Sequence, residues 1–172
     1  MNRHFNEISP FELNYNFFNG LSNDWALLCT GNSEKQANIM TISWGGTGIL
    51  WNKPVAICYV RPQRFTFEIL KECNNFTINF FDHNKYKNEL SICGTKSGRD
   101  INKFEKTGLN LKKIGNNIGV QEAKLILSCK ILYSDFLKEE NFLEKKIVEE
   151  FYPTKDLHKF FIAEITNVLQ AS

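Results

Sequence analysis

Hydrophobic residues occur along this chain in short runs separated by polar, turn-forming residues. The runs are rich in Ile, Val, Phe, Tyr and Thr, which favour strands. Segments such as Gly31-Asn32-Ser33 carry the residues typical of turns. On this pattern we predict six strands, at Trp25–Thr30, Ala37–Trp44, Val55–Arg61, Phe76–Phe80, Lys124–Tyr133 and Lys159–Leu169.

Helical spacing of apolar residues occurs in three shorter stretches. We predict helices at Phe67–Cys73, Tyr86–Ile92 and Arg99–Lys106, with Gly108 as the C-cap of the last one. Many strands with a few short helices between them favour an antiparallel barrel or sandwich. The expected class is therefore mainly β, a barrel with peripheral helices.

A glycine-rich stretch, Gly45-Gly46-Thr47-Gly48, follows one of the predicted strands. It leads into Ile49-Leu50-Trp51, which does not have helical spacing, so we expect a loop between two strands. The sequence contains no G-x-G-x-x-G motif. A doubly wound dinucleotide-binding sheet is therefore not expected.

Composition narrows the class of protein. A chain of 172 residues is long enough for one domain with a sizeable core. The 15 Phe, 5 Tyr and 3 Trp suit a β-rich core or a dimer that buries flat aromatic surface. The formal net charge of +2, without a basic run interleaved with aromatics, argues against a nucleic-acid surface.

The cysteines and the chain start bear on location. The 5 cysteines are odd in number and widely spaced, without a C-x-x-C pair, so we expect buried, reduced thiols. The N-terminal segment has no apolar core, and no apolar run reaches the roughly 20 residues that span a bilayer. We expect a cytoplasmic protein that is not inserted in a membrane.

Arginine is scarce in this chain, yet Arg61 and Arg64 flank Pro62 in the stretch VRPQRFTFE. Proline should end the preceding strand, and Thr66 is a plausible N-cap for the helix that follows. Free N–H groups at a helix start, two guanidinium groups and a hydroxyl would suit a phosphate-sized anion. The alternative is a turn whose arginines pair with surface carboxylates.

A second basic stretch reads CGTKSGRD, and it brings together four residues, Lys96, Ser97, Gly98 and Arg99. Ser97 and Asp100 have the spacing of a capping box, and Gly98 allows close approach of a ligand to the backbone. Many helix starts share this pattern without binding anything. Two arginine-bearing helix starts in one small domain nevertheless favour a phosphorylated ligand.

The segment from Asn38 to Trp44 combines hydroxyl and apolar side chains on one predicted strand. In a strand, Thr41 and Ser43 face one side while Met40, Ile42 and Trp44 face the other. Such a strand could line the edge of a planar heterocycle. An ordinary half-buried strand would have the same pattern.

Other catalytic signals are weak. His158 precedes an apolar strand, and a lone histidine is more often structural than functional. The sequence shows no metal-binding His or Cys spacing, no G-x-S-x-G motif and no carboxylate pair that suggests hydrolysis. We expect neither a metal site nor nucleophilic catalysis.

Six stretches match, in the same order, the motifs of one known family. They are WALLCTG (Trp25–Gly31), NIMTISWGGTGILWNKP (Asn38–Pro54), YVRPQRFTFE (Tyr59–Glu68), FTINFFD (Phe76–Asp82), CGTKSGRD (Cys93–Asp100) and FYPTKDLHKFFIAEI (Phe151–Ile165). Together they resemble the flavin reductase-like family of FMN-binding split-barrel proteins, over nearly the whole chain.

The resemblance implies a single domain over residues 1–172, folded as a six-stranded antiparallel Greek-key split barrel and assembled as a homodimer with FMN near the subunit interface. It implies phosphate binding by Arg61, Arg64 and Thr66, assisted by Lys96, Ser97, Gly98 and Arg99. It also implies a flavin ring flanked by Met40, Thr41, Ile42, Ser43 and Trp44, with Asn79 and Phe80 approaching the same pocket. His158 matches a histidine near the nicotinamide site of related reductases, although Ala163 stands where they commonly have glycine.

The implied activity is hydride transfer from NAD(P)H to FMN. The cofactor supplies the electronics of such a reaction, so the absence of a protein triad or dyad is expected. One alternative is a flavoredoxin-like electron carrier with tightly bound FMN and a protein redox partner. Another is a split-barrel binding module that uses the arginine sites for a different phosphorylated ligand, or for none.

Overall fold

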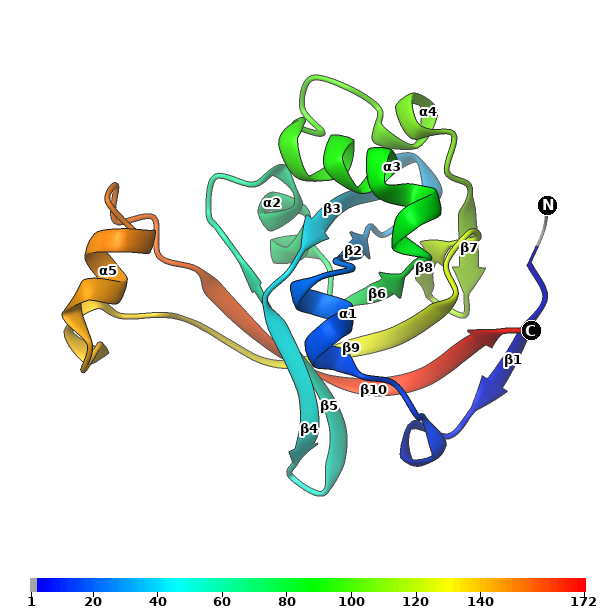
Figure 1. Ribbon diagram of the computed structural model, residues 1–172, viewed down its shortest axis with the longest axis horizontal. Helices are drawn as coiled ribbons and strands as arrows, with labels where there is room; N and C mark the ends of the chain where they lie inside the picture. The colour runs from blue at the N-terminus through cyan, green and yellow to red at the C-terminus, as the bar shows by residue number, and fades with distance from the viewer. Residues whose placement is uncertain (1–2) are drawn as a thin grey trace.

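An eight-stranded antiparallel sheet forms the body of the protein in the computed structural model, which describes residues 3–172. Its main path runs β3–β2–β6–β9–β10–β5–β4, and β1 pairs with β10 beside this path (Figure 1). The strands are β1 Phe5–Ile8, β2 Ala26–Thr30, β3 Asn38–Ile42, β4 Gly45–Leu50, β5 Lys53–Val60, β6 Asn75–Phe80, β9 Leu125–Phe136 and β10 Lys159–Ala171. A separate hairpin consists of β7 Leu111–Ile114 and β8 Asn117–Val120.

Short helices connect the strands. The α-helices are α1 Phe17–Ser22, α2 Phe65–Glu72, α3 His83–Thr95, α4 Lys103–Thr107 and α5 Lys145–Phe151. Three 3₁₀ turns are η1 Pro10–Glu12, η2 Glu34–Gln36 and η3 Glu139–Asn141. Helices α2, α3 and α4 each contact β3. Helix α2 packs on the same core cluster as Leu28, and α3 on the same cluster as Leu27.

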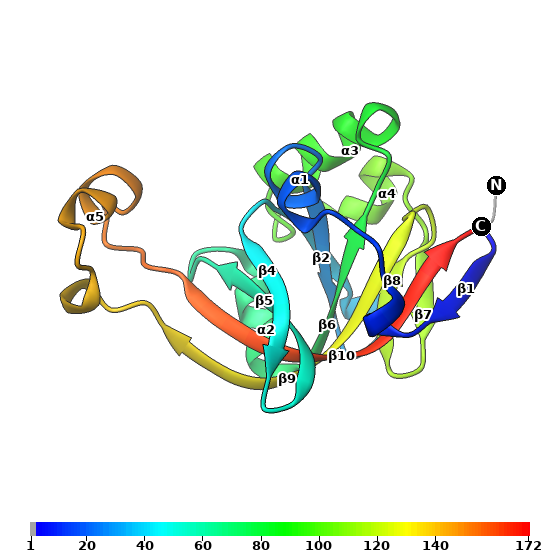
Figure 2. The same cartoon turned by 60° about the horizontal axis from the view of Figure 1, so that its bottom comes forward.

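The strands β9 and β10 are the longest, and they carry the sheet beyond the core (Figure 2). Their pairing shifts register between Ile162 and Ala163 and again between Ile165 and Asn167. Such irregularities bend a strand and increase its twist. The segment between them, residues 137–158, projects from the body with η3 and α5, and we call it the arm.

The core lies on both sides of the central strands. Leu28 faces a cluster that contains Phe80, Leu127 and Phe161, whereas Leu27 faces a second cluster. Successive residues of a strand point to opposite faces, and both leucines are fully buried. Strand β2 is therefore apolar on both faces, which is why its sequence reads as a continuous hydrophobic run.

The mainly β class expected from the sequence is confirmed, and all six predicted strands are present with small shifts at their ends. The number of strands is larger than expected, because β1, β4, β7 and β8 were not predicted as strands. The expected loop at Gly45–Gly48 is wrong: it begins β4, which pairs antiparallel with β5. The hairpin turns at Trp51 and Asn52, which both have left-handed φ angles, 52° and 57°.

Two predicted helix starts are also wrong. Helix α2 begins at Phe65 with Arg64 at its N-cap position, so Thr66 lies inside the helix. Helix α4 begins after Asn102, whose side chain accepts hydrogen bonds from the backbone of Phe104 and Glu105, and Ser97 precedes it in a loop. An Asn at this position caps a helix as well as a serine does.

The expected C-cap of the third helix and the expected buried thiols are confirmed. Gly108 is the C-cap of α4 with φ of 71°, a left-handed angle that glycine adopts without strain. All five cysteines are buried and unpaired. Over residues 3–172 no helix is long and apolar enough to cross a membrane.

Candidate functional site

Two adjoining cavities gather most of the residues singled out from the sequence. The first, which we call the ring cavity, has a volume of about 200 Å³. It is lined by Met40, Thr41, Ile42, Ser43, Trp44, Tyr59, Arg61, Arg64 and His158. The second, which we call the cationic cavity, has a volume of about 230 Å³ and shares Arg64 with the first. It is lined by Asn38, Gln63, Arg64, Phe65, Thr66, Thr95, Lys96, Ser97, Gly98, Arg99 and Lys103.

The ring cavity is built from the end of β3, the end of β5 and the start of β10. The Thr41 hydroxyl donates a 2.5 Å hydrogen bond to the Leu90 carbonyl, which ties β3 to α3. The Trp44 ring lies 5.1 Å from the His158 ring between centroids, and Tyr59 lies 6.3 Å from His158 on another side. The ring planes are tilted by 49° for Trp44 and by 89° for Tyr59 relative to His158, so the rings pack face to edge and form a mostly apolar wall.

His158 is almost fully buried at this wall. Its Nδ1 lies 2.8 Å from the Tyr152 hydroxyl. Burial, and secondarily the nearby charge of Arg61, lowers the pKa of His158 to about 4. The imidazole is therefore neutral at physiological pH.

The side chain of Arg61 binds two residues of the arm. Its Nη1 lies 2.5 Å from Asp156 Oδ2, and its Nη2 donates to the Phe151 carbonyl at 2.9 Å. Burial alone would raise the pKa of Asp156, but hydrogen bonds from Arg61, Gln63 and Thr154 hold that pKa well below its ordinary value. The guanidinium charge of Arg61 is thus compensated by a carboxylate.

Arg64 is held differently. Its Nη1 donates to the Gly94 carbonyl at 2.8 Å and its Nη2 to the Cys93 carbonyl at 3.4 Å. Both carbonyls belong to the last turn of α3, where the helix dipole places partial negative charge. Burial lowers the pKa of Arg64, yet guanidinium stays charged at any physiological pH. Arg64 therefore has its geometry fixed without having its charge neutralised.

Lys103 is the buried cation of this site. Its Nζ donates to the carbonyls of Ile39 and Cys93, both at 2.9 Å, and the residue is 3% exposed. An ammonium group has three hydrogens, so one remains for another acceptor. Burial, and secondarily the charge of Arg64, lowers the pKa of Lys103 to about 8.

The cationic cavity has an unbalanced charge. Arg64, Lys96, Arg99 and Lys103 line it, and no carboxylate does. Of these four, Arg99 reaches a carboxylate outside the lining, with its Nη2 2.5 Å from Glu68 Oε1. A concave surface with this excess of positive charge is suited to an anion.

Two small features shape the same cavity. A Cβ at Gly98 would collide with Asn38 Oδ1 and with the Phe65 ring, so only glycine fits where this loop meets α2. The Thr66 hydroxyl is buried and accepts a 2.9 Å hydrogen bond from Asn38 Nδ2. Thr66 thereby joins the start of α2 to the start of β3.

Asn79 and Phe80 do not line either cavity. Asn79 is fully buried, donating to the Leu27 carbonyl at 3.0 Å and accepting from the Val120 N–H at 2.9 Å. The Phe80 ring packs against Tyr15 at 4.9 Å between centroids. The structure accounts for both residues as parts of the interior.

Sequence reasoning missed Tyr59 and Lys103. Tyr59 follows the alternation of β5 and had no signal beyond its place beside Arg61. Lys103 lies in a lysine-rich sequence and could not be told from solvated lysines, because its partners, Ile39 and Cys93, are distant in the chain. Among residues 3–172 no cluster of three or more His, Cys, Asp or Glu side chains that could hold a metal ion occurs.

Comparisons with known proteins agree with this fold. The chain resembles a flavoredoxin from Methanosarcina acetivorans, with 21% identity, 84% of this chain and 67% of that chain covered, and a TM-score of 0.62. It resembles an FMN-binding domain of a flavin reductases-like enzyme from Shewanella baltica OS155. The identity is 16%, the match covers 99% of this chain and 78% of that chain, and the TM-score is 0.68. A third similar structure is the styrene monooxygenase flavin reductase of Pseudomonas putida S12. The identity is 14%, the match covers 84% of this chain and 77% of that chain, and the TM-score is 0.61.

At these identities the similarity concerns the fold. No curated protein sequence matched this chain significantly. The family model described as "Flavin reductase like domain" matches residues 18–172. The chain, with its split-barrel fold, therefore belongs to the flavin reductase-like family.

Proposed function

We propose that this protein is an FMN-binding oxidoreductase of the flavin reductase type, which takes hydride from NAD(P)H. The observation that carries the proposal is the cationic cavity, with four cations and no carboxylate in its lining. It opens through Arg64 toward a cavity with an aromatic wall. One cavity suits the phosphate of FMN, and the other suits the flavin ring.

The residues present fit this cofactor. Arg64 and Lys103 are oriented by backbone carbonyls, so they need no rearrangement before they meet a phosphate. Each charge-assisted hydrogen bond to such an anion contributes about 1.5–3 kcal/mol. Lys96, Ser97 and Arg99 complete the cavity from the loop before α4. In this assignment Gly98 keeps the loop close to Phe65.

In the ring cavity the side chains of the protein would orient the flavin ring and would take no covalent part in the reaction. Bound FMN supplies the electron-accepting chemistry. Met40 to Trp44 would hold one edge of the ring system, and Tyr59 and His158 line the same cavity. Positioning of this kind lowers the entropy cost of reaching the reactive geometry.

We assign His158 to contact the nicotinamide of the reductant. Burial raises the pKa of Tyr152, so its hydroxyl stays protonated and can donate to His158 Nδ1. The neutral imidazole then carries its hydrogen on Nε2. Because the imidazole is neutral at pH 7, His158 would not donate a proton as a general acid. It would instead donate a hydrogen bond from Nε2 and form part of the aromatic wall.

One observation favours a second function, that of a flavoredoxin-like electron carrier with a protein redox partner. The ring cavity of about 200 Å³ is small, and Trp44, which lines it, packs against Phe151 of the arm with ring centroids 5.6 Å apart. This volume suits one ring system better than two stacked ones. A protein that passes electrons to a partner needs no second ring in the cavity.

We also propose that the protein is a cytoplasmic homodimer. The five unpaired cysteines suit a reducing compartment. Large apolar side chains are exposed near the ring cavity, on the end of β9 and on the arm, and a second copy of the chain would cover them. They include Trp44, Tyr133, Phe136, Leu143 and Phe151.

The test is a visible absorption spectrum of the protein after mixing with FMN and desalting, followed by anaerobic addition of NADH or NADPH. A retained flavin band that bleaches promptly supports the flavin reductase function and identifies the reductant. A retained band that neither nucleotide bleaches, but that a low-potential redox protein does, supports the carrier. Failure to retain FMN, together with no flavin reduction in a steady-state assay, would contradict both.

A further inference from the structure

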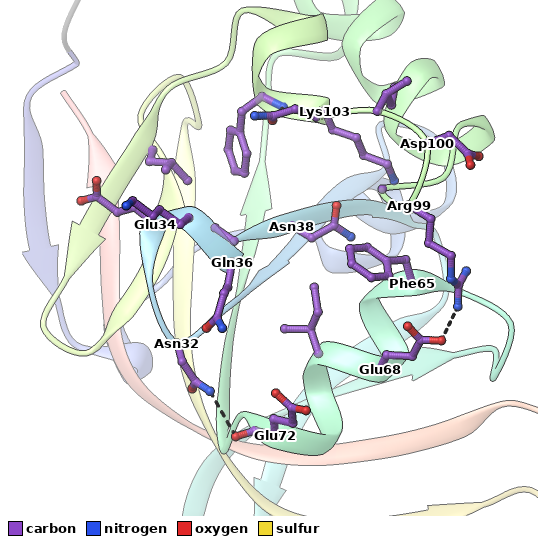
Figure 3. Close-up of a pocket in the computed structure, with 18 residues that line it drawn as sticks. Asn32, Glu34, Gln36, Asn38, Phe65, Glu68, Glu72, Arg99, Asp100 and Lys103 are labelled. Carbon is purple, nitrogen blue, oxygen red and sulfur yellow. Dashed lines mark hydrogen bonds and ion pairs between the residues drawn. The ribbon is translucent and has the colours of Figure 1, made fainter.

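Arg99 stands at the border between two cavities. It lines the cationic cavity, and it also lines a larger cavity of about 710 Å³, which we call the outer cavity. Glu68 lines only the outer cavity. Figure 3 shows the side chains of Arg99 and Glu68 reaching toward one another, and Arg99 Nη2 lies 2.5 Å from Glu68 Oε1. The carboxylate therefore holds the guanidinium group from the outer side.

Both ends of the Arg99 guanidinium group are engaged. While Nη2 binds Glu68, Nη1 donates to the Gln63 carbonyl at 3.1 Å. A phosphate is bound most strongly when a guanidinium group offers two parallel N–H groups to it. Arg99 can make such a contact in the cationic cavity only after it separates from Glu68.

The ion pair between Arg99 and Glu68 is exposed. The side chain of Arg99 is 42% exposed and that of Glu68 is 52% exposed. Within residues 3–172 the Glu68 carboxylate has no other hydrogen bond or ion pair. Water and salt screen a pair of this kind, so it contributes little to stability and little is lost when it separates.

The ion pair of Arg61 is different. Its partner Asp156 has a side chain that is only 17% exposed. The Asp156 carboxylate also accepts hydrogen bonds from Gln63 and Thr154. Three donors thus hold Asp156, whereas one donor holds Glu68. Of these two carboxylates, Glu68 is the one that can give up its arginine easily.

Arg99 can change its partner without movement of its backbone. Ser97 holds the turn, because its Oγ accepts from the Arg99 N–H at 3.1 Å and its carbonyl accepts from the Asp100 N–H at 3.2 Å. The guanidinium carbon of Arg99 lies 5.4 Å from the centroid of the Phe65 ring, and Phe65 lines both cavities. A rotation of the Arg99 side chain along this ring would carry its charge from the outer cavity to the cationic one.

We propose that Glu68 competes with the flavin phosphate for Arg99, and that this competition limits how tightly the protein holds FMN. Arg99 binds Glu68 when no anion is bound, and it turns to the phosphate when FMN binds. This inference rests on the proposed flavin-binding function. It makes Glu68, a carboxylate outside the lining of the cationic cavity, a determinant of flavin exchange.

The same ion pair could instead fasten the loop before α4 to α2 and so support the cavity. The two uses predict opposite effects of removing the carboxylate. Loss of a competitor tightens FMN binding, whereas loss of a fastener weakens it. The exposure of the pair and the separate hydrogen bonds that hold the turn favour the competitor.

The test compares the dissociation constants of FMN for the wild type and for Glu68→Gln, measured by quenching of flavin fluorescence. We expect FMN to bind about three- to fivefold more tightly to Glu68→Gln, the scale of an exposed ion pair, and to dissociate more slowly. Riboflavin, which has no phosphate, should bind both proteins equally. Unchanged or weaker FMN binding in Glu68→Gln would overturn this inference and leave the proposed function intact. Binding of neither flavin by the wild type would overturn the proposed function, and the inference with it.

Glu72→Gln is the matched control. Glu72 is exposed on α2, one turn after Glu68, and it lines the same outer cavity. Within residues 3–172 its carboxylate has no ion pair. The control removes the same charge without releasing an arginine, so FMN affinity should stay close to that of the wild type. Equal tightening in Glu68→Gln and Glu72→Gln would overturn the inference, because a general change of charge would then account for both.

A double-variant cycle with Arg99→Gln isolates the competition. Arg99 and Glu68 are both exposed, so these substitutions leave the core intact. Without Arg99 there is nothing for Glu68 to withhold, and Glu68→Gln should then have little effect on FMN affinity. Tightening of the same size with and without Arg99 would overturn the inference.

Discussion

Arg61 and Arg64 are three positions apart and belong to the same turn, yet the structure holds their charges in opposite ways. Arg61 pairs with the Asp156 carboxylate and with the Phe151 carbonyl, both in the arm. Arg64 donates only to carbonyls, those of Gly94 and Cys93 at the end of α3. One cation is compensated, and the other is oriented but keeps its full charge.

This difference shows that the hydrogen-bond partners of an arginine determine whether its guanidinium group can bind an anion. A carboxylate removes most of the field that an incoming anion would meet, whereas carbonyl dipoles remove only part of it. We therefore expect Arg64 to bind the flavin phosphate. Arg61 we expect to fix the arm and, through it, the segment that carries His158.

The largest effect should come from Arg64→Ala. Loss of a preorganised guanidinium should weaken FMN binding by about 1.5–3 kcal/mol, the scale of a charge-assisted hydrogen bond. Fluorescence titration with FMN measures this effect, and riboflavin, which has no phosphate, is the control ligand. Equal FMN affinity in the variant and the wild type would remove Arg64 from the site.

Lys103→Met should weaken FMN binding by about 1–2 kcal/mol, because the Lys103 ammonium group has one hydrogen left to donate to a phosphate. The effect should depend on pH. Since the pKa of Lys103 is lowered to about 8, the wild-type lysine loses its charge as the pH rises through that value, and FMN affinity should fall with it. Titrations at pH 7 and pH 9 check this, and a pH dependence that persists unchanged in Lys103→Met would contradict it.

Arg61→Ala should affect FMN less, by under about 1 kcal/mol, because its charge is already compensated. The variant leaves Asp156 without its cation, which itself adds negative charge near the ring cavity. The double variant Arg61→Ala/Asp156→Ala should therefore recover most of the lost FMN affinity. A loss in Arg61→Ala as large as that in Arg64→Ala, without recovery in the double variant, would show that the two arginines share the phosphate.

His158→Gln should have the smallest effect on FMN at neutral pH and a larger one on turnover with NAD(P)H. It should also change the acid sensitivity of the fold. The pKa of His158 is about 4 in the folded protein and about 6.5 in an unfolded chain, so only the unfolded chain gains this proton in between. The free energy of unfolding of the wild type should therefore fall between pH 6.5 and pH 4 more steeply than that of His158→Gln. Parallel curves from denaturant titrations would contradict the burial of a neutral imidazole.

Much of the fold could be predicted from local sequence. The apolar run of β2 identifies a buried strand because both of its faces are covered by core clusters. Strand β4 escaped prediction because Gly45, Gly46 and Gly48 lack the side chains that usually signal a strand. Its pairing with β5 is made by the backbone, which the pattern of side chains does not report.

The site was predictable only in part, for a similar reason. The basic stretches around Arg64 and Arg99 do meet in one cavity, and β3 meets His158 in the next. The use of each arginine could not be predicted, because Asp156 lies far from Arg61 in the chain and the α3 carbonyls carry no side-chain signal.

The most direct test of the account is the ratio of the dissociation constants of riboflavin and FMN for the wild-type protein. If the cationic cavity holds the phosphate, FMN should bind at least about 100-fold more tightly, a difference of roughly 2.7 kcal/mol. The ratio should shrink in high salt as the phosphate contacts are screened. Equal binding of the two ligands would contradict the account, because the four cations of the cavity would then have no part in holding the flavin.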